Sequence, residues 1–485
     1  VLADGTPHRR VPIARLIALL DRLAGEIPAL LPRPSPPAGA DLAPVYQLAS
    51  GGTVTFEPGG QVEHSTAPHR TAHAALADAD GLAAALAAAL GEAGVVLVSC
   101  GFDPWHPPGR VPQQLRAPRY PAMAAYFDRR GPDGAAMMRC SAALQVNLDL
   151  GTTEDERRER WLVANLVAPL ALATFAASPD AERGVVSRRA HAWQRLDPTR
   201  TGFPRRLVDG SSADPVEQLL DTALHADVAL FCRQSPGPVD NPGAGAAGIV
   251  PLELGMSAQR PVDSAVDRLV DNANSVDGAP VDNADGWTDG WTDGWTDGWG
   301  PGRPGWTFGD WIRDGHPAHG PPTADDLRYH LSTLFPEVRP RGHLELRSVD
   351  ALPARLRPVP VVLLAGLLED PGARAHGRAV LERWRPRLPE LWRRAAHAGV
   401  ADPELCALAA EVWSFALEGA RRLPPGYLTA AQVTLAECFL DRLTLRGRCP
   451  ADELRAALAR GPAAALAWAS EPSAVAAPDP AESIR

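Results

Sequence analysis

The sequence predicts an α+β protein with a mainly antiparallel sheet, whose strands lie in the first 350 residues and whose helices lie between and after them. Apolar residues alternate with charged or amide residues in three segments, which predict the sheet: Thr53–Ser65, Leu144–Asp149 and His343–Arg347. Alternate side chains of a strand point to opposite faces, so each segment gathers its carboxylates and amides on one side. Such a polar face can hold metal ions and phosphates. Helical periodicity from Pro358 to about Ala469 predicts a helical C-terminal third.

The remaining elements follow from periodicity and turn residues. Pro58, Gly59 and Gly60 predict a turn or bulge between the two arms of the first strand pair. The apolar run Val95–Cys100 predicts a buried strand, and the arginine-rich segment Arg183–Arg206 predicts a loop. Helices are predicted at Val11–Leu31, Ala72–Ala93, Ala122–Arg130, Glu154–Ala177 and Thr323–Leu334.

Composition narrows the classes of function. The 485 residues carry a formal charge of −10, which argues against a general nucleic-acid-binding protein, since that class needs a basic surface. The longest apolar run, Trp161–Ala177, is too short and too rich in alanine for a membrane span, and no signal peptide is visible. The six scattered cysteines form no CxxC motif, which predicts a reduced, cytoplasmic protein.

Residues Ser235–Gly305 differ from the rest of the chain. They are rich in Pro, Gly, Asp and Asn, and hold ten Asp and one Glu against three Arg. A Gly-Trp-Thr-Asp repeat runs from Gly286 to Trp299. Such composition buries too little apolar surface to offset the entropy of ordering, so we predict a disordered insertion. A calcium site or a weakly adhesive tryptophan segment are the alternatives.

A series of short motifs, each weak alone, resembles one family in order and spacing over about 300 residues. The chain resembles glutamate–cysteine ligases of the plant and actinobacterial type, and most closely the actinobacterial enzymes that supply ergothioneine synthesis. The motifs are Phe56–Glu63, Arg119–Met123, Met137–Met138, Gln145–Asp149, Ser178–Pro179, Arg189–Trp193, Asp197–Gly202, Phe335–Arg339 and Leu344–Arg347.

The resemblance implies the fold of a glutamine-synthetase catalytic domain, in which a curved antiparallel sheet lines a funnel. It also implies ATP, Mg²⁺, L-glutamate and L-cysteine as ligands. In the implied reaction the glutamate γ-carboxylate attacks the γ-phosphorus of ATP, and the cysteine amine then displaces phosphate from γ-glutamyl phosphate. The implied division of the chain is a catalytic domain over 1–234 and 306–357, interrupted by the insertion at 235–305, and a helical region over 358–485.

The implied metal ligands are Glu57, Glu63 and Glu345, because carboxylates hold the Mg²⁺ that offsets phosphate charge. Glu63 is also the expected proton acceptor for the incoming amine. Arg347 is the expected phosphate contact and a catalytic residue. Gln61 and Asn147, together with Arg347, are expected to bind the nucleotide. The alternative for Glu57 and Glu63 is that both are solvated glutamates on an exposed strand face. The alternative for Glu345 and Arg347 is a surface salt bridge across strands.

The implied substrate pocket contains an arginine and a tryptophan four residues apart. Arg189 is expected to hold the α-carboxylate of glutamate through a bidentate guanidinium, and Trp193 to pack against its methylenes. The alternative is a solvated arginine-rich loop. Further expected substrate-binding residues are Arg119, Tyr120, Gln145 and Arg233, with hydrogen bonding between strands as the alternative for Gln145. For Arg200 and Arg339 the sequence does not separate ligand binding from structure.

One departure from the family concerns the N-terminus. The family is expected to begin its sheet with a strand carrying Glu-x-Glu before the position of Val1, and Val1–Gly5 resembles the tail of that strand. Loss of that pair would remove part of the metal site. Two alternatives to the ligase therefore stay open: a ligase of the same fold with another amine acceptor, and an inactive relative that binds a partner through the insertion.

Overall fold

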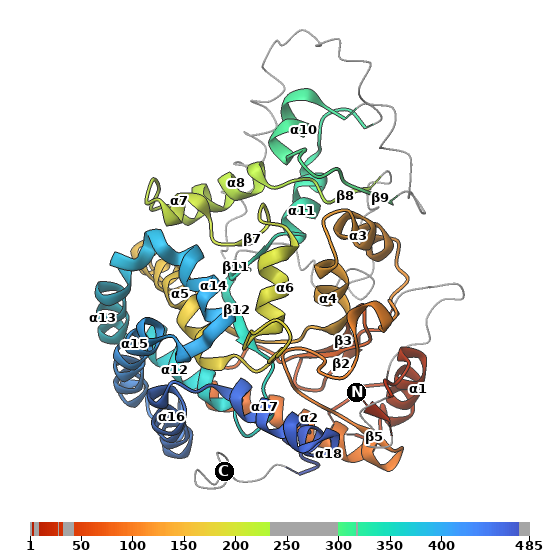
Figure 1. Cartoon of the computed structure of the whole chain (residues 1–485), viewed down its shortest axis with the longest axis vertical. Coiled ribbons are helices and arrows are strands. Elements are labelled where there is room, and N and C mark those ends of the chain that lie inside the picture. The colour runs from red at the N-terminus through yellow and green to blue at the C-terminus, as the bar shows by residue number, and fades with distance from the viewer. Residues whose placement is uncertain are drawn as a thin grey trace.

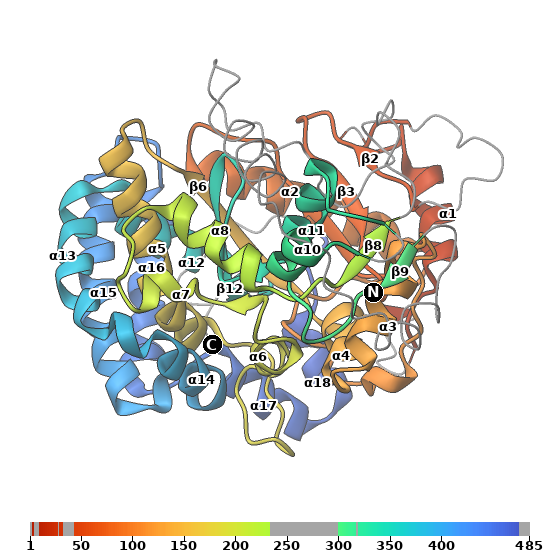
Figure 2. The ribbon, with the colours of Figure 1, turned by 90° about the horizontal axis from the view of Figure 1, so that it is seen from above.

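The computed structural model describes residues 2–3, 9–27, 29–32, 43–232, 299–316 and 319–474. The predicted α+β class is confirmed, with small and mostly antiparallel sheets among many helices. Figure 1 shows the helices of residues 358–442 on the left, and the N-terminal hairpin and α1 (Ile13–Leu23) on the right, with β12 (His343–Asp350) and α6 (Arg188–Leu196) between them; the view from above agrees (Figure 2). The last two helices, in residues 450–469, lie at the bottom of Figure 1.

The first predicted strand pair is confirmed as an antiparallel hairpin, with β2 added at its edge. The three strands are β2 (Tyr46–Gln47), β3 (Thr53–Phe56) and β4 (Val62–Ser65). Val54 and Phe56 on one face are buried in a core shared with α1 (Ile13–Leu23) and α2 (Ala72–Glu92). The opposite face of the hairpin is therefore the one that carries polar residues toward the centre of the molecule.

The other two predicted strands pair with each other. The sheet has the order β11–β12–β6, with β11 at Val338–Pro340, β12 at His343–Asp350 and β6 at Ala143–Asp149. Leu344 lies opposite Leu148 and Leu346 opposite Val146, all four in the main core. A register shift between Leu346 and Val349 interrupts the pairing.

The main core joins this sheet to the C-terminal helices. Helix α5 (Glu154–Phe175) is buried from Trp161 onward and packs on β12. Helices α12 (Pro358–Glu369) and α15 (Pro403–Arg422) cross so closely that a Cβ on Gly366 would lie 2.1 Å from the Ala416 carbonyl oxygen. One continuous core thus supports the back of the sheet, as expected for a polar face turned the other way.

The remaining elements complete the chain. They are β1 (Leu2–Ala3), β5 (Val95–Val96), α3 (Arg119–Asp128), α4 (Asp133–Cys140), α6 (Arg188–Leu196), β7 (Thr201–Gly202), α7 (Arg205–Val208), α8 (Pro215–His225), β8 (Leu230–Cys232), β9 (Trp299–Pro301), α10 (Phe308–Asp314), α11 (Ala324–Ser332), β10 (Phe335–Pro336), α13 (Pro371–Leu381), α14 (Leu388–Ala398), α16 (Ala430–Arg442), α17 (Pro450–Arg460) and α18 (Pro462–Ala469).

Three sequence predictions about elements are wrong in detail. The first helix ends at Leu23, because Gly25 adopts a φ of +94° that takes the chain out of the helical region. Only Val95–Val96 of the predicted strand Val95–Cys100 forms a strand. The predicted loop at 183–206 contains helix α6, whose N-terminus is capped by the Ser187 side chain. The insertion at 235–305 lies outside the described residues except for its last seven.

Helix α2 is unusually apolar. Among the described helices it alone is long and apolar enough to cross a membrane: an 18-residue stretch has a mean hydropathy of 1.4, and 28% of that stretch is buried. Its buried residues Leu82, Leu86 and Leu90 pack in the hairpin core. Core helices pass the same test, so one such helix is weak evidence for a membrane span.

Candidate functional site

The hairpin turn brings two glutamates to one face. The turn is closed by hydrogen bonds from the Glu57 amide to the Gln61 carbonyl (2.9 Å) and from the Gly60 amide to the Glu57 carbonyl (2.8 Å). Gly60 adopts a φ of +83°, a conformation that favours glycine. Glu63 pairs with Thr55 across the hairpin and accepts a hydrogen bond from its hydroxyl at 3.1 Å. Glu57 continues the same face two residues after Thr55.

The tip of the hairpin is docked beside the start of β6. A Cβ on Gly59 would lie 2.1 Å from the Arg139 carbonyl oxygen, so only glycine permits this approach. The Gln61 side-chain amide donates to the Ser141 carbonyl at 3.1 Å, and the Gln114 amide donates to the Gly59 carbonyl at 2.8 Å. These contacts fix the hairpin tip against the end of α4 and the loop that leads into β6.

Strand β12 carries Glu345 on the polar face, surrounded by arginines. Glu345 lies across from Asn147 on one side and from Arg339 on the other. Its carboxylate forms ion pairs with Arg347, with Arg341 (3.5 Å) and with Arg339 (3.8 Å). Burial opposes ionisation of Glu345, but these guanidinium groups outweigh it and lower its pKa to about 2.

The hairpin glutamates interact electrostatically with the arginines around Glu345. We call the group the acidic–arginine cluster; its members are Glu57, Glu63, Glu345, Arg119, Arg339 and Arg347. Burial, followed by the negative charge of Glu63, raises the pKa of Glu57 to about 8, against the opposing effect of the three arginines. Burial and the neighbouring Arg347 lower the pKa of Arg339 to about 9. Two carboxylates thus lie together where a further positive charge would stabilise them.

Several buried polar atoms of this site have no hydrogen-bond partner among the described residues. Such atoms are uncommon in native proteins, and a catalytic role or a bound ligand, ion or water accounts for many of them. In and around the acidic–arginine cluster they are Gln61 Oε1, Arg119 Nε and Nη1, Trp193 Nε1 and Arg339 Nε. The donors suit an anion and Gln61 Oε1 accepts, so the arrangement fits an anionic ligand with polar substituents.

Helix α6 places Trp193 at the site and turns Arg189 into the fold. The Arg347 guanidinium lies over the Trp193 ring, 5.7 Å from its centroid. Arg189 Nε donates to Asp350 at 2.6 Å and its Nη2 donates to the Ser348 carbonyl at 2.9 Å. Arg189 is thus paired with an internal carboxylate, because a buried guanidinium needs a counter-charge, and its contact with the α-carboxylate of glutamate stays a prediction.

The other expected residues are placed as follows. Tyr120 lies close enough to both hairpin glutamates that they help to raise its pKa, after burial as the main cause. Gln145 is half-buried and Asn147 exposed on β6. Arg233 lies outside the described residues.

The three expected metal-ligating carboxylates belong to two neighbouring groups. Within the described ranges, no group of three or more His, Cys, Asp or Glu side chains is placed to hold a metal ion. Glu57 and Glu63 influence each other electrostatically, and Glu345 forms ion pairs with arginines. A metal-binding role for Glu57, Glu63 and Glu345 stays a prediction.

Sequence reasoning missed Asp350, which organises the support of the site. Asp350 is fully buried and accepts hydrogen bonds from the Ala177 amide (2.8 Å), Ser178 (2.6 Å), Ser187 (3.1 Å) and Arg189 (2.6 Å). It follows the register shift in β12, so alternation from Glu345 could not place it.

The structure also assigns Arg200, which the sequence had left open. Arg200 is buried and donates to Asp197 at 2.7 Å and to the Thr333 carbonyl at 2.8 Å. Tyr126 donates to the same Asp197 at 2.6 Å. Arg200 is therefore structural, whereas Arg339 faces the acidic–arginine cluster.

Comparison with known proteins shows the family of this chain. The family model described as "Glutamate-cysteine ligase family 2 (GCS2)" matches residues 10–469, nearly all of the chain. The chain belongs to glutamate–cysteine ligase family 2. The resemblance inferred from the motifs is thus confirmed, and with it the assignment to a family of ligases.

Individual members of glutamate–cysteine ligase family 2 are similar over most of the chain. The "Glutamate--cysteine ligase EgtA" of Mycolicibacterium smegmatis is 33% identical over 435 residues, covering 88% of this chain and 83% of the relative. The protein of the same name from Mycobacterium tuberculosis is 32% identical over 411 residues, covering 84% of this chain and 77% of the relative. The chloroplastic glutamate–cysteine ligase of Medicago truncatula is 27% identical over 323 residues, covering 66% of this chain and 50% of the relative.

Proposed function

We propose that the acidic–arginine cluster catalyses ATP-dependent ligation of L-cysteine to the γ-carboxylate of L-glutamate, and that the product supplies ergothioneine synthesis. Membership of glutamate–cysteine ligase family 2 and the names of the EgtA relatives support this reaction. The observation that carries the proposal is the adjacent pair Glu57 and Glu63 beside half-buried arginines whose buried N–H groups have no partner among the described residues. The proposed fold is a funnel lined by a curved sheet, to which β2–β3–β4 and β11–β12–β6 contribute.

The residues present fit Mg²⁺ at the hairpin. The pKa of Glu57 stays raised in spite of three nearby arginines, so a further cation would stabilise its charged form, and oxygen ligands are those that Mg²⁺ prefers. In the proposal Glu57 and Glu63 hold the ion. When bound, Mg²⁺ would offset the negative charge of the nucleotide phosphates.

In the proposed first step, a γ-carboxylate oxygen of glutamate attacks the γ-phosphorus of ATP, and ADP leaves. The guanidinium groups of Arg339 and Arg347 stabilise the charge on the transferred phosphoryl group. Stacking of Arg347 on Trp193, together with its ion pair to Glu345, fixes its position before the phosphate arrives. Glu345 is thus proposed as the residue that orients the arginines.

In the proposed second step, the cysteine amine nitrogen attacks the acyl carbon of γ-glutamyl phosphate, and phosphate leaves. The proton released by the amine passes to Glu63. Gln61 and Asn147 are proposed to bind the nucleotide, and Tyr120 and Gln145 the amino acids. Arg119, with two unpartnered nitrogen atoms, is proposed to hold a glutamate carboxylate.

The reaction is tested by incubating the full chain with ATP, Mg²⁺, L-glutamate and L-cysteine. We expect phosphate release to require both amino acids, and mass spectrometry to detect γ-glutamylcysteine. Phosphate release that is independent of both amino acids would contradict the proposal. Preference for another amine over cysteine would replace it with a different carboxylate–amine ligase.

Substitution of Arg119 tests the glutamate contact. Arg119→Gln is expected to raise the KM for glutamate by about tenfold to a hundredfold, since a hydrogen bond to a charged group contributes about 1.5–3 kcal/mol. Its melting temperature should hardly change, because Arg119 Nε and Nη1 have no partner in the fold. Arg116→Gln, an exposed arginine three residues earlier, is the matched control. An unchanged KM in Arg119→Gln would exclude the contact.

A further inference from the structure

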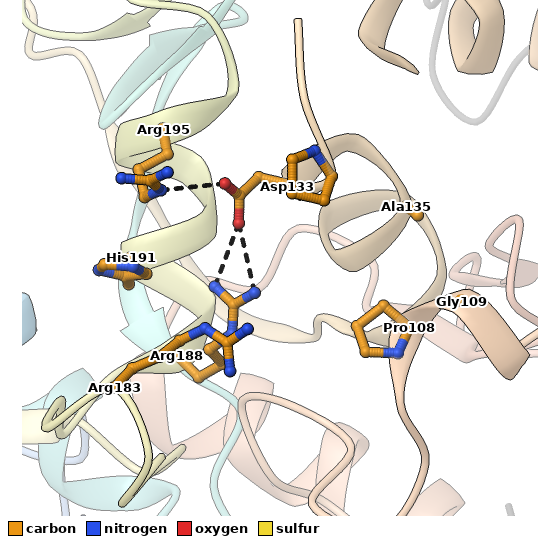
Figure 3. A pocket seen from close by; sticks show the side chains of 9 residues that line it. Pro108, Gly109, Asp133, Ala135, Arg183, Arg188, His191 and Arg195 are labelled. Carbon is orange, nitrogen blue, oxygen red and sulfur yellow. Dashed lines mark hydrogen bonds and ion pairs between the residues drawn. The ribbon is translucent and has the colours of Figure 1, made fainter.

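A second site that is rich in arginine lies on the other face of α6. A cavity of about 330 Å³ opens between this helix, the start of α4 and the loop at Pro108. In Figure 3, Asp133 points toward the arginines of α6, while Pro108 and Gly109 form the opposite wall. Its lining residues are Pro108, Gly109, Pro132, Asp133, Ala135, Arg183, Arg188, His191 and Arg195.

Helical geometry separates this cavity from the acidic–arginine cluster. Arg188, His191 and Arg195 are three or four residues apart and share one face of α6. Arg189 and Trp193 share another face, which contacts β12 and its arginine. The cavity is therefore a distinct site and belongs to no role proposed above.

Charge in the cavity is unbalanced. Asp133 accepts hydrogen bonds from Arg195 at 3.1 Å and from both terminal nitrogens of Arg188 at 3.3 Å. Asp180 lies 2.8 Å from Arg183 and 3.6 Å from Arg188. Two carboxylates thus face three guanidinium groups, which leaves one net positive charge.

The two walls of the cavity differ in chemistry. Arg188 is 6% exposed and held in place, while the side chains of Arg183 and Arg195 are 47% and 60% exposed and reach the opening. The opposite wall is formed by proline, glycine and alanine, which offer apolar contact. Both terminal nitrogens of Arg188 already donate to Asp133, so the two exposed guanidinium groups of Arg183 and Arg195 are the ones placed to bind an oxyanion.

We propose that this cavity binds a small anionic molecule through an oxyanion head group, a phosphate or a carboxylate, with a compact apolar part against the proline wall. The volume matches a small metabolite, because ligand cavities measure about 300–1,000 Å³. The site is independent of the ligase reaction, and so is its test.

His191 provides a local reporter for the test. The full chain is labelled at histidine, and its imidazole resonances are followed by NMR during titration with inorganic phosphate and, separately, with succinate at constant ionic strength. The spectrum of His191→Gln identifies the resonance. We expect the His191 resonance to shift saturably at millimolar concentration with at least one probe, and the responding probe identifies the head group.

Two variants decide whether the arginines bind the probe. The double variant Arg183→Gln/Arg195→Gln is expected to weaken binding at least about tenfold, because it removes two charged donors. Both side chains are exposed, so the fold should be kept. Arg205→Gln, whose side chain is 65% exposed and paired with Asp221, is the matched control and should bind as the native chain does. A His191 resonance that neither probe shifts, or an equal shift in the double variant, overturns the proposal.

Discussion

Glu57→Gln is expected to abolish ligase turnover and to make the free protein more stable at neutral and alkaline pH. The activity loss should reach at least about a hundredfold, since charge stabilisation by a bound metal ion contributes several kcal/mol. The gain in stability follows from the structure, because desolvation of the half-buried Glu57 and the neighbouring charge of Glu63 make its ionisation costly. Glutamine keeps the shape of the side chain and removes that cost.

The pH dependence of stability has a definite sign. The pKa of Glu57 rises from 4.5 to about 8 on folding, so between these values the folded chain binds more protons than the unfolded chain. Stability from this group is therefore largest at low pH and falls as the pH rises through about 8. Thermal unfolding at about pH 5 and about pH 9 should show Glu57→Gln equal to the native chain at the lower pH and more stable at the higher.

Two further measurements test whether the effects of Glu57→Gln come from the loss of the Glu57 charge. Glu92→Gln, an exposed glutamate at the end of α2, should change neither activity nor the pH profile. Added Mg²⁺ should raise the melting temperature of the native chain at alkaline pH but not that of Glu57→Gln, because a ligand stabilises only the state that binds it. A large fall in the melting temperature of Glu57→Gln would instead show that Glu57 is structural.

Asp350→Ala is expected to destabilise the protein by about 3–5 kcal/mol, because it leaves the buried Arg189 without its counter-charge. The same change removes the acceptor for Ser178, Ser187 and the Ala177 amide. Chemical denaturation measures the free energy of unfolding. Asp314→Ala, at an exposed ion pair with Arg313, should cost no more than about 1 kcal/mol.

A double-mutant cycle separates this ion pair from general packing. Adding Arg189→Met to Asp350→Ala should recover part of the lost stability, since no unpaired buried charge then remains. Turnover should stay low in both variants, because the N-terminus of α6 loses the contacts that place Trp193 beside Arg347. Additive losses of stability in the double variant would contradict the assigned ion pair.

The strand predictions succeeded for a local reason. In β3, in β6 and in β12 as far as Leu346, apolar and polar residues alternate without interruption and the apolar residues pack into a core, so the face to which each side chain points follows from the period of two. Gly59 and Gly60 correctly predicted the turn at the hairpin tip, since Gly59 lies against the Arg139 backbone and Gly60 adopts a positive φ. The pairing of β6 with β12, almost 200 residues apart in sequence, follows from no local pattern.

Helix α6 shows where local reasoning fails. Its arginines at 188, 189 and 195 suggested a solvated loop, although arginine is a good helix former. Two of the three are buried, because Asp133 from α4 and Asp350 from β12 supply their counter-charges. Those partners lie far away along the chain, so their pairing is visible only once the fold is known.

By itself the sequence determined the α+β class, the three polar-faced strands, the hairpin turn and the ligase family, because each rests on side-chain period, on glycine or on motif order. Only the tertiary structure decided that Glu57 and Glu63 share one charge environment with three arginines. It also decided that Glu345 is neutralised and that Arg189 is turned inward to Asp350. The physical reason is that ionisation and pairing depend on burial and on neighbours within a few ångströms, which strands and helices distant in sequence provide.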